Sequence, residues 1–212
     1  MNKSRLTLVG GGAFGRELIN WALDIAKAGN FPEVSGFLDM GPEALGEYGY
    51  ELEYLGDIEQ YSPRDSEKFV IAIGDPNKKR KIVELLKNKG AQFETLIHPS
   101  AVIARSAVLG EGVVVCPNSF VSADARIGDF VAINGLSSIG HDVDLGSYST
   151  LSAHVDLTGW VKVGEGCFFG TGAKVMPKVT IGRGSRIGAG SLIMRDVKPE
   201  TVMYAMPAKK FK

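Results

Sequence analysis

The sequence predicts two architectures in succession: a parallel α/β domain over residues 1–98 and an all-β parallel β-helix over residues 99–212. Three observations support this fold class. Short apolar runs alternate with helical segments up to about residue 97. A six-residue repeat replaces that pattern from residue 101. A content of 44% hydrophobic and 23% charged residues is typical of an ordinary globular protein.

The first half opens with a predicted strand, Arg5–Val9, which is followed by a cluster of glycines. A helix is expected over Arg16–Ala28, because its apolar residues have helical spacing and Gly29 is a typical C-terminal cap. Further strands are predicted at Val34–Leu38 and at Phe69–Ile73. Strands separated by helices indicate a parallel sheet.

A second helix is predicted to begin at Asp75-Pro76, because an N-cap carboxylate followed by proline is a helix start signal. It should run to about Lys89 and stop at Gly90, and a last strand, Phe93–Ile97, should complete the sheet.

The second half is defined by an apolar residue at every sixth position. Each unit is one short strand and a bend, with the large side chain inside, a small residue two positions earlier at the corner, and glycine for the bend's backbone angles. Three units make one triangular coil. The sixteen apolar positions are Ile103, Leu109, Val115, Val121, Ile127, Ile133, Ile139, Leu145, Leu151, Leu157, Val163, Phe169, Val175, Ile181, Ile187 and Ile193.

The bulk charge and the cysteines exclude several classes of protein. With 24 basic and 24 acidic residues, nothing favours nucleic acid or an anionic membrane as partner. The apolar run Leu6–Val9 is too short for a signal-peptide core or a membrane span. Two cysteines, Cys116 and Cys167, without a repeating spacing fit a reduced cytoplasmic protein, with Cys167 in a structural corner position.

His141 is the candidate catalytic residue among the chain's three histidines. It lies at a predicted bend and is followed by Asp142, whose carboxylate could orient the ring. Imidazole is a good general base near neutral pH. Gly159 lies 18 residues later, one coil along, where its amide could stabilise an oxyanion. Asn134, near the preceding corner, is a candidate for orienting an acceptor or fixing the histidine.

A zinc site is the alternative for these histidines, because some β-helices hold zinc between three histidines. That site needs a close histidine pair and a third ligand from a neighbouring turn. His141 and His154 are 13 residues apart and belong to different faces of the predicted prism, and His98 lies at the junction between the halves. No metal is therefore predicted.

Several short motifs, taken in order, carry a family resemblance over essentially the full length. They are Leu8-Val9-Gly10-Gly11-Gly12-Ala13-Phe14-Gly15, Gly36-Phe37-Leu38-Asp39, Ile71-Ala72-Ile73-Gly74-Asp75, Leu96-Ile97-His98-Pro99-Ser100-Ala101, Ile139-Gly140-His141-Asp142 and Met206-Pro207-Ala208-Lys209. The chain resembles the NeuD/PglD-type bacterial sugar acyltransferases. That resemblance implies a Rossmann-like nucleotide-sugar domain joined to a left-handed β-helix in a homotrimer, with acetyl-CoA as co-substrate.

The resemblance also implies roles for individual residues. His141 would be the general base, Asp142 would increase its basicity, and Gly159 would supply the oxyanion amide. The pantetheine arm would lie between subunits. Thr150, Thr171 and Ala189 fall at the family's coenzyme-contacting positions, although a histidine is common at the place of Thr150. Acyl transfer would be direct, without a covalent enzyme intermediate.

The glycine motif after the first strand is a candidate anion site. Gly10-x-Gly12-x-x-Gly15 between a strand and a helix could cradle a pyrophosphate, and taken alone would suggest a nicotinamide cofactor. With this second half, a nucleotide-linked sugar is favoured, with Asp39 near its uridine or ribose. Gly74 is assigned to the same site. Ala13-Phe14 replaces the family's usual Gly-His, and Met40 replaces a second acid.

Three functions remain open from the sequence. The first is an acetyl-CoA-dependent N-acetyltransferase acting on a nucleotide-linked amino sugar for surface glycan synthesis. The second is an O-acyltransferase acting on another sugar, such as a sialic acid. The third is a non-catalytic β-helix protein that binds sugar nucleotides. His141, Asp142 and Gly159 favour the enzymes.

Overall fold

The first part of the chain is a parallel five-stranded sheet with helices on both faces. The computed structural model describes residues 5–29, 34–46 and 48–206. The strands lie in the order β3-β2-β1-β4-β5 and all pairs are parallel. Their bounds are β1 Arg5–Val9, β2 Val34–Asp39, β3 Tyr54–Asp57, β4 Glu67–Ile71 and β5 Gln92–Phe93, and the helices are α1 Ala13–Ala28, α2 Glu43–Gly46 and α3 Pro76–Asn88.

The helices cover the sheet because each has one apolar stripe. Leu18, Ala22 and Ile25 of α1 pack with the strand residues Leu6 and Leu8. On the opposite face, Val83 and Leu86 of α3 pack with Val9, Phe69 and Ile71. A two-sided cover of this kind explains why the strands are almost continuously apolar.

Most of the predicted elements are confirmed, with shifted ends. The first strand has the predicted bounds, and Gly29 caps α1 with φ 107°. The helix α1 begins at Ala13, three residues earlier than predicted. Strand β4 is displaced toward the N-terminus, to Glu67–Ile71. Helix α2 and strand β3 were not predicted.

The predicted strand Phe93–Ile97 is wrong as a single element. Gln92–Phe93 pairs with β4 in the first sheet, whereas Leu96–Ile97 (β6) pairs with β9 of the β-helix. The chain leaves one sheet and joins the other within three residues. The β-helix therefore begins inside the stretch assigned to the first domain.

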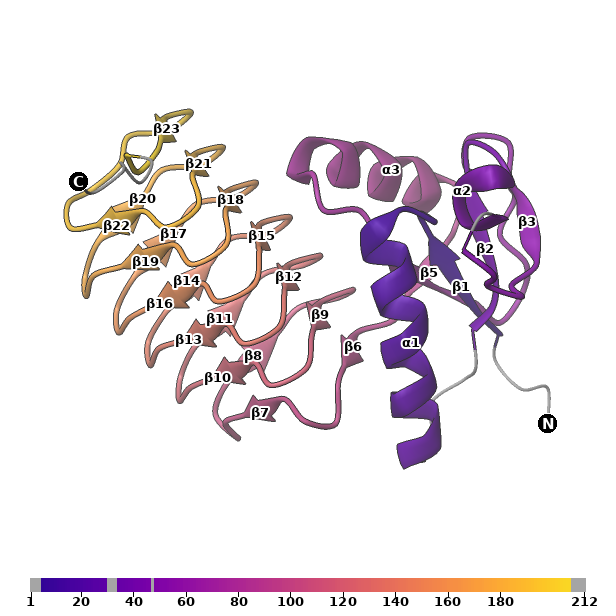
Figure 1. The fold of residues 1–212 in the computed structure, drawn as a ribbon, viewed down its shortest axis with the longest axis horizontal. Helices are drawn as coiled ribbons and strands as arrows, with labels where there is room; N and C mark the ends of the chain where they lie inside the picture. Colours follow the sequence, from indigo (N-terminus) through magenta and orange to yellow (C-terminus); the bar gives the residue numbers. More distant parts are fainter. Residues whose placement is uncertain (1–4, 30–33, 47, 207–212) are drawn as a thin grey trace, which may run out of the picture.

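The second part is a three-sided prism, confirmed at all sixteen hexads (Figure 1). Face I holds β6 Leu96–Ile97, β9 Val114–Val115, β12 Ala132–Ile133, β15 Thr150–Leu151, β18 Phe168–Phe169, β21 Arg186–Ile187 and β23 Val202–Met203. Face II holds β7 Val102–Ile103, β10 Phe120–Val121, β13 Ser138–Ile139, β16 Asp156–Leu157, β19 Lys174–Val175 and β22 Leu192–Ile193. Face III holds β8 Val108–Leu109, β11 Arg126–Ile127, β14 Asp144–Leu145, β17 Lys162–Val163 and β20 Thr180–Ile181.

The glycines that follow the core residues have a different role from the one predicted. A Cβ at Gly128 would lie 2.6 Å from the backbone nitrogen of Ser147, and one at Gly146 would lie 2.5 Å from the carbonyl carbon of Gly164. These glycines permit close stacking of successive coils. The left-handed backbone angles fall two residues later, at Phe130, Tyr148 and equivalent positions.

Helix α3 joins the two parts (Figure 1). Phe93 of the first sheet packs edge-on against Phe130 of the β-helix, with ring centroids 5.0 Å apart. Asp75 pairs with Arg186 on face I, and Arg80 pairs with Glu165. The first part therefore packs on face I and on the corner between faces III and I.

None of the helices that the structure describes is long and apolar enough to cross a membrane. Pro207, Ala208 and Lys209 of the closing motif lie outside the described residues.

Candidate active site

His141 lies on the corner between faces II and III, held from two sides. Its Nδ1 is 2.8 Å from Asp142 Oδ2, and both side chains are about half exposed. The indole of Trp160 meets the imidazole edge-on, with ring centroids 4.3 Å apart and planes at 89°. When Nδ1 carries a hydrogen donated to Asp142, Nε2 is free to accept a proton.

Gly159 lies directly beside the Cε1–Nε2 edge of the His141 imidazole. A Cβ at this position would be 2.6 Å from both Cε1 and Nε2 of His141. Only glycine therefore leaves room for the ring in this position. Among the described residues, the Gly159 N–H has no hydrogen-bond partner. The predicted stacking of His141 and Gly159 in successive coils is present.

Asn134 lies on another corner, between faces I and II. Its Oδ1 is 3.5 Å from Cys116 Sγ, and its backbone N–H donates to Leu151 O at 3.0 Å. Within one protomer Asn134 therefore does not contact His141.

Thr171 and Ala189, two of the three candidate coenzyme contacts, share the corner between faces I and II. Both are exposed, and they stack in successive coils, because the Thr171 carbonyl accepts from Gly190 N at 2.9 Å. They form a continuous exposed edge that a linear ligand could follow.

The expectation for Thr150 needs correction. Its side chain is only 2% exposed and lies beneath helix α3, where Oγ1 is 2.8 Å from Lys79 Nζ. A residue covered in this way has no surface for a coenzyme. Thr150 is a contact between the two parts of the chain, and it is not retained as a coenzyme contact.

The glycine motif lies at the carboxyl ends of β1, β2 and β4, where the strand order reverses direction beside β1. Ligands of open α/β sheets bind at such a switch point. Gly10 has φ 104°, and a Cβ at Gly15 would overlap the Gly10 carbonyl. Both glycines therefore allow the tight turn into α1.

The N-terminus of α1 is open toward this edge. Gly12 is its N-cap and provides no side-chain hydrogen bond, and the first turn has no acidic residue. Helix α3 differs, because Asp75 accepts from Asn77 N and Lys78 N at 3.0 Å each. Unoccupied N–H groups at a helix N-terminus favour a bound anion.

The other predicted residues surround this open end. Gly12 and Ala13 are exposed, whereas Phe14 is partly buried against the core of the sheet. Asp39 accepts from Gly11 N at 2.6 Å and from Met40 N at 2.7 Å, so its carboxylate also fixes the loop. Gly74 lies near the end of β4, with nothing within 4 Å of where a Cβ would be.

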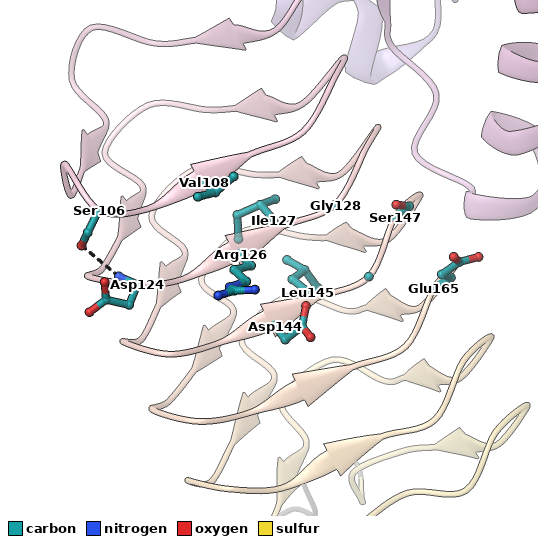
Figure 2. A pocket seen from close by; sticks show the side chains of 11 residues that line it. Ser106, Val108, Asp124, Arg126, Ile127, Gly128, Asp144, Leu145, Ser147 and Glu165 are labelled. Atoms are coloured by element: carbon teal, nitrogen blue, oxygen red, sulfur yellow. Dashed lines mark hydrogen bonds between the residues drawn. The ribbon is translucent and has the colours of Figure 1, made fainter.

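A shallow hollow lies on face III (Figure 2). Asp124, Arg126 and Asp144 contribute charges to it, and Ser106 Oγ accepts from Asp124 N at 3.1 Å. Asp124 is on the same corner as His141, one coil earlier, but His141 does not line the hollow. The hollow is therefore a neighbour of the histidine site and not part of it.

Among the residues that the structure describes, no three His, Cys, Asp or Glu side chains lie close enough together to hold a metal ion. His141 and His154 lie on different corners. His98 is bound through Nδ1 to Ser100 Oγ at 2.8 Å. Both cysteines are buried, and burial raises the pKa of Cys116 and that of Cys167, the latter to about 11.

Trp160 contacts the His141 imidazole and Lys79 covers Thr150, and neither residue was predicted from the sequence. Trp160 had a signal: it occupies the third position after a core residue, where Asn, Asp and Gly recur. Lys79 had none, because its burial depends on a surface of the β-helix.

Two family models match the chain. The one described as "PglD N-terminal domain" matches residues 5–86, and "Bacterial transferase hexapeptide (six repeats)" matches residues 161–195. UDP-N-acetylbacillosamine N-acetyltransferase of Bacillus subtilis (strain 168) is 45% identical over 47 residues, which span only 22% of this chain and 22% of that relative.

Solved structures match over nearly the whole chain. PerB from Caulobacter crescentus, in complex with CoA and GDP-perosamine, is 32% identical over 96% of this chain and 95% of that chain, with a TM-score of 0.83. The acetyltransferase domain of PglB from Neisseria gonorrhoeae is 26% identical over 98% and 100%, with a TM-score of 0.85. WeeI from Acinetobacter baumannii is 25% identical over 96% and 98%, with a TM-score of 0.80.

A hexapeptide-repeat left-handed β-helix with a histidine–carboxylate pair on one corner, preceded by a Rossmann-like sheet, defines a class of acyltransferases. The 32% identity to PerB, over nearly the full length of both chains, identifies the family within this class. The chain belongs to the NeuD/PglD-type family of bacterial sugar acyltransferases.

Proposed function

We propose that this protein transfers the acetyl group of acetyl-CoA to the amino group of a nucleotide-linked amino sugar. The observation that carries the proposal is the His141–Asp142 pair stacked over Gly159. Support comes from PerB, whose structure contains CoA and GDP-perosamine. A structure of the PglB acetyltransferase domain contains acetyl coenzyme A.

In the proposed reaction, the sugar amine attacks the thioester carbonyl while His141 Nε2 removes a proton from the nitrogen. Asp142 holds the imidazole in the required tautomer through Nδ1. The Gly159 N–H stabilises the negative charge on the former carbonyl oxygen. The carbon–sulfur bond then breaks, and the sulfur leaves and takes the proton from the imidazolium, which gives an amide and free CoA.

The two candidate binding regions lie on opposite sides of the prism. His141 is on the corner between faces II and III, and face I is the side opposite that corner. The first part of the chain, which carries the glycine motif, packs on face I through Asp75–Arg186 and Lys79. A sugar nucleotide held by the glycine motif of one protomer would therefore lie away from the His141 of the same protomer.

A homotrimer resolves this separation, and we infer that each site is built between protomers. Residues 1–98 of one protomer would hold the nucleotide, and residues 99–212 of its neighbour would supply His141. Thr171 and Ala189 would line the groove for the pantetheine arm, and Asn134 of the adjoining protomer would orient the acceptor. Closed cyclic symmetry makes all three sites equivalent.

In the nucleotide site, the open N-terminus of α1 would bind the pyrophosphate, with Gly10 and Gly12 allowing close approach. Phe14, Asp39 and Gly74 would surround the remainder of the nucleotide.

The test is thiol release from acetyl-CoA with a panel of acceptors: GDP-perosamine, UDP-N-acetylbacillosamine, free sialic acid and simple hydroxyl compounds. Turnover with a nucleotide-linked amino sugar, reduced ~10²-fold or more in His141→Ala, is the expected result. If sialic acid were the only acceptor acetylated, the protein would be an O-acyltransferase and the proposed N-acetyltransferase function would be wrong. Acceptor binding without any turnover would point to a non-catalytic sugar-nucleotide protein.

A further inference from the structure

Trp160 occupies a backbone position that does not suit its side chain. It lies at the bend after β16 with φ 59°, in the left-handed region that favours glycine, asparagine and aspartate. The residue is 49% exposed. Eight other non-glycine residues have similar angles at equivalent bends, so the repeat itself imposes this conformation. The backbone angle alone therefore identifies no functional site, and the contacts of each bulky side chain decide its role.

Two other aromatic residues at equivalent bends have an evident reason. Phe130 and Tyr148 have φ 56° and 63°, and their rings stack with centroids 5.5 Å apart. Both pack against helix α3, since Lys87 lies over the ring of Phe130 and Arg80 over that of Tyr148. On the corner between faces III and I, the bulky side chains at these left-handed backbone positions therefore complete a contact with helix α3.

Trp160 has no such partner domain within the described protomer, and its neighbours are the proposed catalytic groups. Its ring is edge-on to His141 with centroids 4.3 Å apart, and Lys178 Nζ is 5.5 Å from its centroid. It follows Gly159 directly in the chain. A base accepts a proton only from an atom about 3 Å away. Any acceptor ring that reaches His141 Nε2 therefore lies beside the indole.

We propose that Trp160 is a specificity-determining residue that forms an aromatic wall of the acceptor subsite. The inference rests on the proposed function and extends it to the sugar. The flat, half-exposed indole matches the apolar C–H face of a pyranose ring, so a sugar with few hydroxyl groups on that face is favoured. The pantetheine arm is a narrow chain of amides and has no flat apolar face to cover an indole.

The substitution Trp160→Asn separates this role from a structural one. Asparagine suits the left-handed angles, so the fold should be retained or stabilised. With the panel acceptor that the wild type acetylates, the KM for the acceptor should rise about tenfold, near the upper end of one aromatic contact. The KM for acetyl-CoA should change less than about twofold, and Trp160→Phe should recover part of the loss.

The matched control is Glu200→Asn, at another exposed left-handed position, φ 57°, on a different corner. It should leave both KM values unchanged. An unchanged acceptor KM in Trp160→Asn, or a rise confined to acetyl-CoA, overturns the proposal while the proposed function stands. A change in oligomeric mass also overturns it, because the ring would then belong to a contact between protomers. If the wild type acetylates no acceptor of the panel, both the proposed function and the proposed role of Trp160 are overturned.

Fluorescence gives an independent readout, because the chain has two tryptophans, Trp21 and Trp160. In Trp21→Phe the emission comes from Trp160 alone. The sugar nucleotide should change this emission, whereas GDP or UDP alone should not. An equal response to the free nucleotide would place Trp160 outside the sugar subsite and overturn the proposal.

Discussion

Lys79 Nζ lies 2.8 Å from Thr150 Oγ1, and this contact joins helix α3 to the β-helix across 71 positions of sequence. The same nitrogen is 2.9 Å from Phe130 O and 3.2 Å from Ser149 O. Burial lowers the pKa of Lys79 from its ordinary 10.5 to about 7, opposed in part by Asp75. A neutral amine is still satisfied there, since it can donate to both carbonyls and accept from the Thr150 hydroxyl.

Lys79 should therefore make the stability of the protein depend on pH. The unfolded chain keeps this proton up to about pH 10.5, whereas the folded chain loses it near pH 7. Between these values the unfolded state binds more protons, so the free energy of unfolding rises with pH, by at most roughly 1.4 kcal/mol per pH unit. Lys79→Met should abolish this rise in denaturant unfolding measured from pH 7 to pH 9.

The control is Lys78→Met, which removes an exposed lysine from the same helix turn. It should keep the wild-type pH dependence. Parallel stability curves for wild type and Lys79→Met would show that Lys79 does not titrate in this range.

Gly159→Ala should inactivate the enzyme without unfolding it. The new methyl group would lie 2.6 Å from Nε2 of His141, and the half-exposed imidazole can rotate away, so the fold tolerates the change. Turnover should fall ~10²-fold or more, as for loss of a general base. In a His141→Ala background the same substitution should have little further effect on kcat. Additive losses would show that Gly159 acts independently of the histidine.

Ala13→Asp should separate folding from ligand binding. A carboxylate in the first turn of α1 interacts favourably with the helix N-terminus, by roughly 0.3–1 kcal/mol, and should raise the thermal midpoint slightly. The same charge repels a pyrophosphate at that N-terminus. We expect GDP or UDP binding to weaken at least about tenfold by calorimetry, with acetyl-CoA binding unchanged. Unchanged nucleotide affinity would show that the phosphates do not bind at the N-terminus of α1.

Sites shared between protomers predict complementation. His141→Ala and Ala13→Asp chains should be co-expressed and assayed at an acceptor concentration too low for Ala13→Asp alone to turn over. They should assemble into mixed oligomers in which about a quarter of the sites combine an unaltered first part of one chain with an intact His141 of its neighbour. Light scattering should show a trimer of the 22.7 kDa chain. Mixed oligomers without activity would mean that each protomer completes its own site.

All sixteen strands of the hexad repeat were predictable from the sequence, because each large apolar side chain can be buried only in the interior of its own coil. The Asp75 cap of α3 was predictable for a similar local reason. The stacking of His141 over Gly159 followed from their separation of 18 residues, which is one coil.

Only the tertiary structure decided what covers each corner and face. Thr150 is hidden because a lysine from a distant helix is buried against it, and no local pattern records that contact. The division of Phe93–Ile97 between two sheets depends on which partner strand each pair of residues meets. The placement of His141 opposite the first part of the chain depends on the face of the β-helix against which that part packs. Periodicity determines which side chains point inward, but contacts between remote segments determine which outward side chains remain free to bind a ligand.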